Sequence, residues 1–307
     1  MDPIEKIQFI SMADIEERFL KRGKAVVASG VTEQWPARKW TLSSLQERFR
    51  ERKIWIRGGS RSRWRRLEQV AFGEYVDALS SDFALEPWGR YAEERAYAAF
   101  NRLPEMDNEF GFDAIIDKSI YERSPIMMWL GPRDALTPLH YDASGATMLT
   151  QIIGSKKATL FGFEQSKYLY PSRVFDFMSV FSEVNIDRPD HGRHPLFAKA
   201  KSAEVVLHPG ETLFIPRLMW HQMVSPEISL SVTMRYARPR ELLGTKAYWY
   251  GWGGLHMLGL ASKGNCLCHI VDIPKEDLEV RGKLVELLGR IGGTGGHGRD
   301  LSTLMGW

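Results

Sequence analysis

The sequence predicts a mainly β protein whose core is an antiparallel sandwich or barrel. Short runs of β-branched and aromatic residues follow one another from residue 125, and Gly and Pro residues separate them. The runs lie at 126–130, 146–153, 158–163, 203–207, 212–215 and 228–236. Close strands that end at turn residues are typical of antiparallel sheets, whereas a parallel sheet needs a helix between successive strands. With 307 residues, of which 44% are hydrophobic, the chain is long enough to bury a large core.

The residues before this core, 1–124, predict a flank of mixed helices and strands. Apolar residues recur at helical spacing in 11–20, where Ser11 can cap the first turn. Weaker helical patterns cover 41–49 and 72–79, and the apolar run 25–30 predicts a short buried strand. We expect this flank to support the core and not to carry the chemistry.

The residues after the core, 241–307, predict a helical extension, so that the core itself spans 125–240. Apolar residues recur at helical spacing in 275–291, and the Gly-rich run 292–296 follows. This helix could pack against the core, or it could form the interface of a homodimer.

Charge, cysteine content and the N-terminal residues predict a cytoplasmic protein. The net charge of +3 is too small to identify a nucleic-acid-binding protein. No run of about 18 apolar residues is present, so we expect no membrane span. Met1 and Asp2 begin a segment without the basic and then apolar pattern of a secretory signal. The two cysteines, Cys266 and Cys268, are too close in sequence for a favourable disulfide, which fits a reducing compartment.

The densest basic run lies at 57–66, where arginines alternate with Gly, Ser and Trp64. Such a run could contact phosphates and stack on a base, so nucleic acid is one candidate partner. An acidic peptide or carrier protein would suit the same charges. We favour a solvated hairpin loop, because the rest of the chain is nearly balanced in charge.

His140 and Asp142 form the strongest candidate for a metal site. They follow a predicted loop over 131–138, and residues two apart on an extended chain point to the same side. Of the eight histidines, His140 alone has an acidic residue two positions on. His221, at the end of a segment that begins with a Pro-Gly turn, is the candidate third ligand. Two His and one carboxylate on one face suit Fe(II) with open coordination positions. The alternatives are a surface turn pair for His140 and Asp142, and a core histidine for His221.

Three ordered segments carry a resemblance to a known family. They are Thr137-Pro138-Leu139-His140-Tyr141-Asp142, Gln151-Ile152-Ile153-Gly154-Ser155-Lys156, and the run from Pro209 to His221. Together they resemble the JmjC/cupin-like oxygenases that depend on Fe(II) and 2-oxoglutarate, in particular the asparaginyl hydroxylase of hypoxia-inducible factor and the tRNA wybutosine hydroxylase. The resemblance covers residues 25–236. It implies a double-stranded β-helix, or jelly-roll, core with flanking N-terminal and C-terminal helices, and Fe(II) held by His140, Asp142 and His221.

The resemblance also implies how 2-oxoglutarate is held. Lys156 matches the lysine that pairs with its distal carboxylate, and Thr137 and Tyr97 match a threonine and a tyrosine beside it. A buried carboxylate needs such charge-assisted hydrogen bonds. Thr147 and Thr233 stand where relatives carry Asn, so the pocket differs in detail. Read without the family, Lys156 would be a solvated turn lysine. Four residues that flank the metal ligands are candidate substrate contacts: Trp129, Arg133, Arg217 and Arg235.

The activity that the resemblance implies is hydroxylation of an unactivated C–H bond, with O2 consumed and succinate and CO2 as co-products. The expected substrate is an amino-acid residue of a peptide or protein, or a free amino acid. Removal of an N-methyl group and hydroxylation of a tRNA base are alternatives within the same fold. A non-catalytic cupin-like binding module is the alternative outside the enzymes, because Thr in place of Asn could abolish co-substrate binding.

Overall fold

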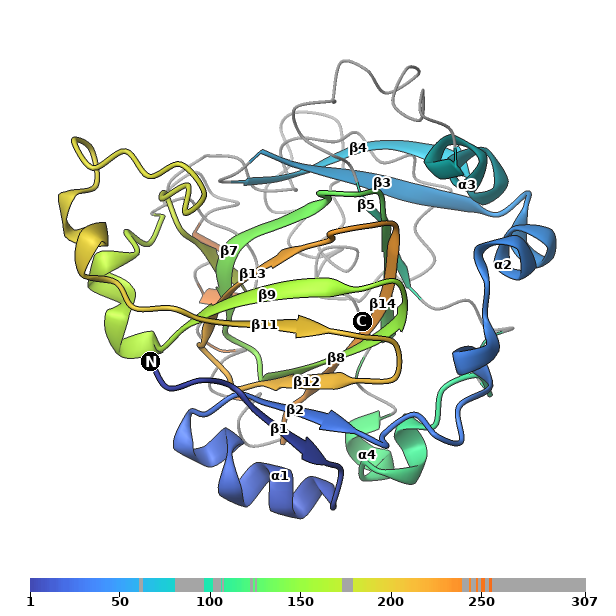
Figure 1. The fold of residues 1–307 in the computed structure, drawn as a ribbon, viewed down its shortest axis with the longest axis horizontal. Coiled ribbons are helices and arrows are strands. Elements are labelled where there is room, and N and C mark those ends of the chain that lie inside the picture. The colour runs from blue at the N-terminus through green and yellow to red at the C-terminus, as the bar shows by residue number, and fades with distance from the viewer. Residues whose placement is uncertain are drawn as a thin grey trace.

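The computed structural model describes residues 1–60, 63–80, 97–101, 108–121, 126–172 and 179–238, and a few single residues outside these ranges. Its strands form two sheets that face each other (Figure 1). The large sheet has nine strands in the order β1-β2-β12-β8-β14-β6-β5-β3-β4, and the small sheet has five in the order β10-β7-β13-β9-β11. The predicted mainly β fold with a jelly-roll core is confirmed.

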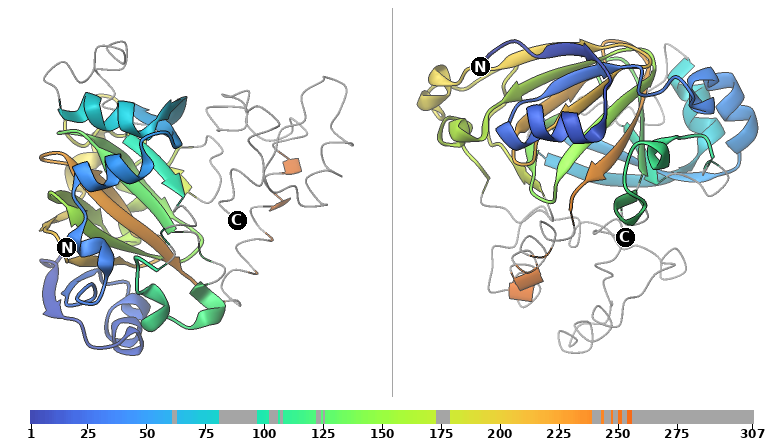
Figure 2. Two further views of the ribbon diagram at one scale, coloured as in Figure 1. Left: turned by 90° about the vertical axis from the view of Figure 1, so that its right-hand side faces the viewer. Right: turned by 90° about the horizontal axis from the view of Figure 1, so that it is seen from below.

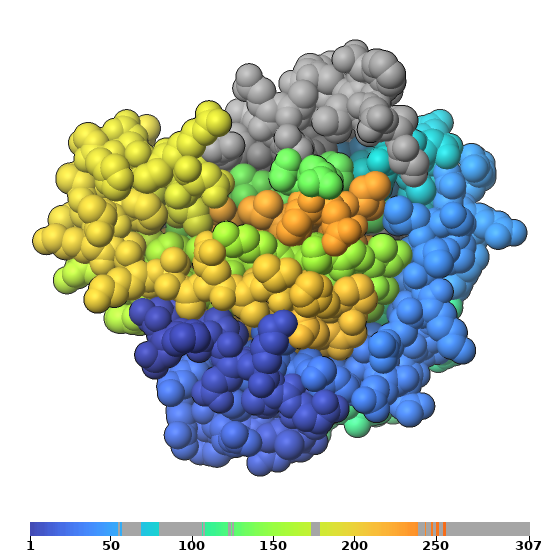
Figure 3. Space-filling model, viewed as in Figure 1, coloured from blue at the N-terminus to red at the C-terminus, as the bar shows by residue number. Residues whose placement is uncertain are grey.

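The core strands follow the predicted runs closely. They are β6 (Ile126–Gly131), β7 (Leu136–Asp142), β8 (Ala146–Ile153), β9 (Lys156–Phe161), β10 (Ser179–Phe181), β11 (Ala203–Leu207), β12 (Thr212–Ile215), β13 (Trp220–Val224) and β14 (Ser229–Tyr236). Between β9 and β11 the chain forms the short 3-10 helices η6 (Phe163–Tyr168) and η7 (Pro195–Lys199). The segment around η7 forms the yellow lobe at the left of Figure 3.

The predicted loop over 131–138 is wrong at its C-terminal end, because β7 already begins at Leu136. Pro138 hid this strand, since proline cannot donate a ladder hydrogen bond and usually marks an edge or a bulge. The structure has that bulge: across β7 and β13, His221 is opposite His140, while Met223 is opposite Thr137. One extra residue of β7 is therefore accommodated between two paired positions.

The central strands of the large sheet, β12, β8 and β14, are buried on both faces over most of their length. Met148 and Val232 belong to an outer core that they share with the N-terminal helices, whereas Leu149 and Leu213 belong to the core between the two sheets. Because both faces pack against protein, β12 reads as an almost continuous apolar run, whereas β14 alternates apolar residues with polar ones.

The N-terminal flank covers the outer face of the large sheet, and Figure 2 shows its helices alongside that sheet. The flank holds β1 (Glu5–Gln8), α1 (Met12–Arg18), β2 (Val26–Ser29), α2 (Leu42–Phe49), β3 (Lys53–Ser60), β4 (Arg63–Ala71), α3 (Phe72–Ser80), β5 (Tyr97–Asn101) and α4 (Lys118–Tyr121). The side chain of Ser11 caps α1 as predicted, and Thr41 caps α2 in a capping box. Strand β2 pairs with β12, so the flank extends the same sheet.

Helix α1 is also tied to the end of the last core strand. Glu16 of α1 accepts hydrogen bonds from the Tyr236 hydroxyl at 2.8 Å and from Arg238 at 2.7 Å. Burial, together with the Glu16 carboxylate, raises the pKa of Tyr236 to about 12. The hydroxyl therefore stays protonated and keeps donating at any physiological pH.

The described residues of the basic run, 57–60 and 63–66, do not form a loop. They lie on β3 and β4, which pair from Lys53 opposite Ala71 to Ser60 opposite Arg63. Even Gly58 and Gly59 take paired positions in the hairpin. Both strands also lie near β7, so the hairpin is beside the strand that carries His140.

Some predictions fall outside the described residues. They are the helix over 275–291, the homodimer interface on it, and the reduced state of Cys266 and Cys268. The division of the chain at 124 and 240 and the cytoplasmic location also stay predictions, because nothing in the structure tests them. Within the described part of the chain, every helix is too short or too polar to cross a membrane.

Candidate metal centre

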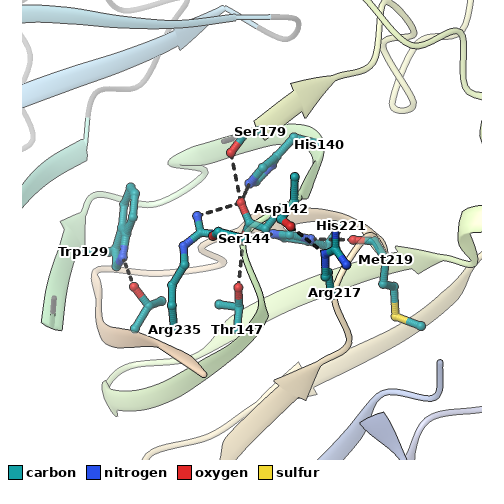
Figure 4. A network of polar contacts seen from close by, with 12 residues as sticks. Trp129, His140, Asp142, Ser144, Thr147, Ser179, Arg217, Met219, His221 and Arg235 are labelled. Carbon is teal, nitrogen blue, oxygen red and sulfur yellow. Dashed lines mark hydrogen bonds and ion pairs between the residues drawn. The ribbon is translucent and has the colours of Figure 1, made fainter. Parts of the chain in front are cut away.

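Neighbouring strands of the small sheet bring His140, Asp142 and His221 together (Figure 4). His140 and Asp142 are two residues apart on β7, and His221 is directly opposite His140 on β13. The two imidazole centroids are 4.2 Å apart, and one candidate ligand atom from each of the three residues lies within 4.8 Å of the others. All three side chains are buried, with 8% or less of each residue exposed. The surface-turn alternative therefore does not describe His140 and Asp142, and His221 is a buried histidine whose ring faces the other two residues.

Hydrogen bonds to the backbone fix the tautomer of both histidines. His140 Nδ1 lies 2.7 Å from the carbonyl oxygen of Pro138, and His221 Nδ1 lies 2.9 Å from that of Met219. A carbonyl oxygen only accepts, so each Nδ1 carries the proton and each Nε2 keeps a free lone pair. Both Nε2 atoms face Asp142, at 3.8 Å from Oδ1 for His140 and 3.8 Å from Oδ2 for His221.

Burial keeps both imidazoles neutral. It is the largest cause that lowers the pKa of His140 to about 3, and the neighbouring His221 lowers it further. Burial likewise lowers the pKa of His221. Neutral imidazole is the form that binds a metal ion, so the site needs no deprotonation of histidine at neutral pH.

Asp142 is ionised and held by three donors. The Thr147 hydroxyl donates to Oδ2 at 2.8 Å, the Ser179 hydroxyl donates to Oδ1 at 3.0 Å, and Arg235 Nη2 donates to Oδ1 at 2.8 Å. Burial by itself would raise the pKa of the carboxyl group, but the Arg235 guanidinium and the Thr147 hydroxyl outweigh it and lower the pKa. Two neutral imidazoles and one carboxylate make a donor set that fits Fe(II).

The bulge in β7 places Thr137 on the metal-facing side. His221 and Met223 are two apart on β13 and share a face, so their partners His140 and Thr137 share a face of β7. Without the bulge, a residue three positions before His140 would point to the opposite side. Thr137 is half-buried there.

Alternate residues of β14 form a polar row between Lys156 and the metal centre. Ser231 accepts a hydrogen bond from Lys156 Nζ at 2.6 Å, Thr233 accepts one from the Trp129 indole at 2.8 Å, and Arg235 reaches Asp142. Four residues of strand span about 13 Å. The row is thus long enough to lie beside a five-carbon dicarboxylate between the lysine and the metal ligands.

Lys156 is not a solvated turn lysine, because only 2% of it is exposed. Burial lowers the pKa of its ammonium group from 10.5 to about 7. The neighbouring Lys157 is the solvated one, and it pairs with Glu204 at 2.9 Å. A lysine buried inside the barrel suits a ligand that brings a negative charge with it.

The other predicted site residues are placed as follows. Arg217 is exposed, and its Nε donates to the carbonyl oxygen of Ala143 at 2.6 Å, one residue after Asp142. Arg133 is exposed in the turn between β6 and β7. Tyr97 begins β5, where its backbone pairs with Arg57; its side chain lies outside the description.

Sequence reasoning missed two serines of the site. Ser231 could have been found, because it shares the face of Thr233 and Arg235 on a strand that was predicted. Ser179 could not, since its place beside Asp142 depends on the pairing of β10 with β7 across 37 residues of sequence. No local pattern around Ser179 indicates that pairing.

Comparison with known proteins agrees with this architecture. The cupin-like domain family matches residues 12–241. HSPB1-associated protein 1 of Rattus norvegicus is 28% identical over 245 residues, which cover 72% of this chain and 50% of the relative. Lysine-specific demethylase 8 of Xenopus tropicalis is 27% identical over 239 residues, covering 75% of this chain and 52% of the relative.

A third relative carries the JmjC domain in its name. JmjC domain-containing protein D of Dictyostelium discoideum is 27% identical over 243 residues, covering 72% of this chain and 53% of the relative. The chain thus spans about half the length of the relatives it matches. The family match covers residues 12–241, and the structure has the two-sheet core with its His-Asp-His cluster. The chain therefore belongs to the cupin-like domain family, together with JmjC-type proteins.

Proposed function

We propose that the protein is an oxygenase that depends on Fe(II) and 2-oxoglutarate and hydroxylates an unactivated C–H bond. The observation that carries this proposal is the buried convergence of His140, Asp142 and His221, whose ligand atoms lie within 4.8 Å of one another. The family membership supports it, since JmjC-type proteins are among the relatives.

Each part of the site has a task in this proposal. His140, Asp142 and His221 would hold Fe(II), and Lys156, with Ser231 and Thr137 nearby, would pair with the distal carboxylate of 2-oxoglutarate. Bound together, the metal and co-substrate supply the activation of O2 and the oxidation of the C–H bond, with succinate and CO2 released. The protein has to orient the two ligands and exclude water. The buried side chains around the site serve the second task.

The proposed substrate is an amino-acid residue of a peptide or protein, or a free amino acid. Two relatives support a protein substrate by their names, one as a demethylase specific for lysine and one as a protein associated with HSPB1. The first name makes N-methyllysine the second candidate, because hydroxylation of an N-methyl carbon leads to loss of that carbon. Candidate peptides should therefore include methylated and unmethylated lysine.

The first test is an anaerobic titration with Fe(II) and 2-oxoglutarate. The wild-type protein should develop the weak visible charge-transfer band of the chelate, and His140→Ala should not. His208→Ala is the matched control, because His208 is exposed in the turn after β11. Absence of the band in the wild-type protein would overturn the proposal, and metal uptake without the band would indicate a binding module.

The second test identifies the product. Incubation with candidate peptides, amino acids and host extract, followed by mass spectrometry, should show a product heavier by one oxygen atom. Loss of a methyl group with release of formaldehyde would indicate the demethylase instead. Product on tRNA, with binding that weakens as salt rises, would indicate an RNA substrate held through phosphate contacts.

A further inference from the structure

The hydrogen bonds on Asp142 distinguish its two carboxylate oxygens. A carboxylate offers about four acceptor sites, two on each oxygen. Arg235 and Ser179 both donate to Oδ1, at 2.8 and 3.0 Å, whereas Thr147 is the one donor to Oδ2, at 2.8 Å, among the residues that the structure describes. Protein donors therefore use both acceptor sites of Oδ1, whereas Oδ2 keeps one acceptor site for another partner.

From this geometry we propose that Arg235 is a positioning residue that makes Asp142 a metal ligand through Oδ2 alone. This inference rests on the proposed function, and it assigns Arg235 a role other than substrate contact. In Figure 4 the guanidinium reaches Asp142 from the left, the side on which Trp129 lies, while both imidazoles lie on the right. Arg235 thus holds Oδ1 without occupying the space between the three ligands.

Arg235 is itself held in place before any metal binds. Its Nη1 donates to the Ser144 hydroxyl at 3.0 Å, and its backbone is paired with Thr147 across β14 and β8. Arg235 and Thr147, which donate to different oxygens of Asp142, therefore stand opposite each other in one sheet. Such support by a rigid strand pair is what keeps a ligand in one orientation.

The orientation matters because of the number of coordination positions. Two imidazoles and one carboxylate oxygen leave three positions of an octahedral ion for ligands from solution. A second oxygen from Asp142 would leave only two. The proposed reaction needs three, two for 2-oxoglutarate and one for O2, so the hold on Oδ1 preserves the position that the reaction requires.

The test uses Co(II) as a spectroscopic probe bound to the whole protein. Arg235→Met should change the position and intensity of the visible Co(II) bands at saturating metal and weaken Co(II) binding about 10- to 100-fold. Ser179→Ala should shift the bands in the same direction by a smaller amount. Arg235→Lys should recover part of the wild-type spectrum, because it restores a donor and the charge.

Arg238→Met is the matched control. It removes an arginine three residues further along, whose partner is Glu16 and not Asp142, and it should leave the Co(II) spectrum unchanged. The far-ultraviolet circular dichroism of each variant checks that it is folded. Arg235→Met and Ser179→Ala proteins that are folded and have the wild-type spectrum and affinity would overturn the inference while the proposed function stands. Failure of the wild-type protein to bind Co(II) would overturn both.

Discussion

Replacing Lys156 by Met should stabilise the protein without its ligands, although it removes a residue that the proposed function needs. Burial lowers the pKa of Lys156 from 10.5 to about 7, so the folded state binds this proton less tightly than the unfolded state. At about 1.4 kcal/mol for each tenfold step, the cost to the folded protein at pH 6 is about 5 kcal/mol. The hydrogen bond to Ser231 offsets about 1 kcal/mol of that cost.

Met has nearly the length of Lys and no charge, so Lys156→Met avoids the cost and leaves no large cavity. We expect the free energy of unfolding at pH 6 to rise by about 2–4 kcal/mol, measured by urea denaturation. The gain must depend on pH. Between pH 7 and pH 10 the unfolded wild-type chain carries the proton and the folded one does not, so wild-type stability rises with pH. The advantage of the variant should therefore be about 3 kcal/mol smaller at pH 9 than at pH 6.

Lys157→Met is the control, because Lys157 is solvated and forms a surface ion pair with Glu204. It should change stability by less than about 1 kcal/mol at either pH. A Lys156→Met protein that is less stable than wild type at pH 6 would refute the reasoning. So would a stability difference that stays constant from pH 6 to pH 9, because it would mean that the buried lysine titrates normally.

Three further predictions concern the ligands and one turn. The affinity of the metal-loaded protein for 2-oxoglutarate or an analogue, measured by calorimetry, should fall about tenfold from pH 6 to pH 8, and binding at pH 8 should take up a proton. The reason is that only protonated Lys156 pairs with a carboxylate and its pKa is about 7. An affinity that does not change with pH would contradict this. A divalent metal ion at about 100 times its Kd should raise the free energy of unfolding by about 2.7 kcal/mol, measured by thermal unfolding. Chelation of the metal, or His221→Ala, should abolish this stabilisation. An equal stabilisation of the variant would exclude His221 as a ligand. Gly154→Ala should lower the free energy of unfolding by about 1–3 kcal/mol, measured by urea denaturation. Gly154 has φ +63°, and an added Cβ would collide with the carbonyl oxygen of Ile228. A variant as stable as the wild-type protein would show that the turn relaxes.

The parts of the site that the sequence predicts are those with a local signal. His140 and Asp142 were identified because two ligands on one strand must be two residues apart, and that spacing is visible in a single chain. The strands β8, β11 and β12 were predicted at their observed bounds, because buried β-branched runs between turn residues have few other interpretations.

The parts that the sequence does not predict depend on contacts between distant segments. The extension of β7 to Leu136 was hidden by Pro138, whose bulge exists only because β13 lies alongside. Arg235 was expected at the substrate, but its partner is Asp142, 93 residues earlier in the chain. A strand pattern indicates which side chains share a face, and it does not indicate which side chain stands across the barrel from them.

The central strands of the large sheet are buried on both faces, and this limits how far the chain can be shortened. A protein that began at residue 125, after the N-terminal flank, would keep every candidate metal ligand. It would also lose β2, which pairs with β12, and the helices that cover Met148, Phe214 and Val232. An open strand edge beside an uncovered apolar face is a surface that promotes aggregation. We therefore expect a stable fragment of this protein to include the flank, and we expect a chain cut before its first core strand not to yield the barrel alone.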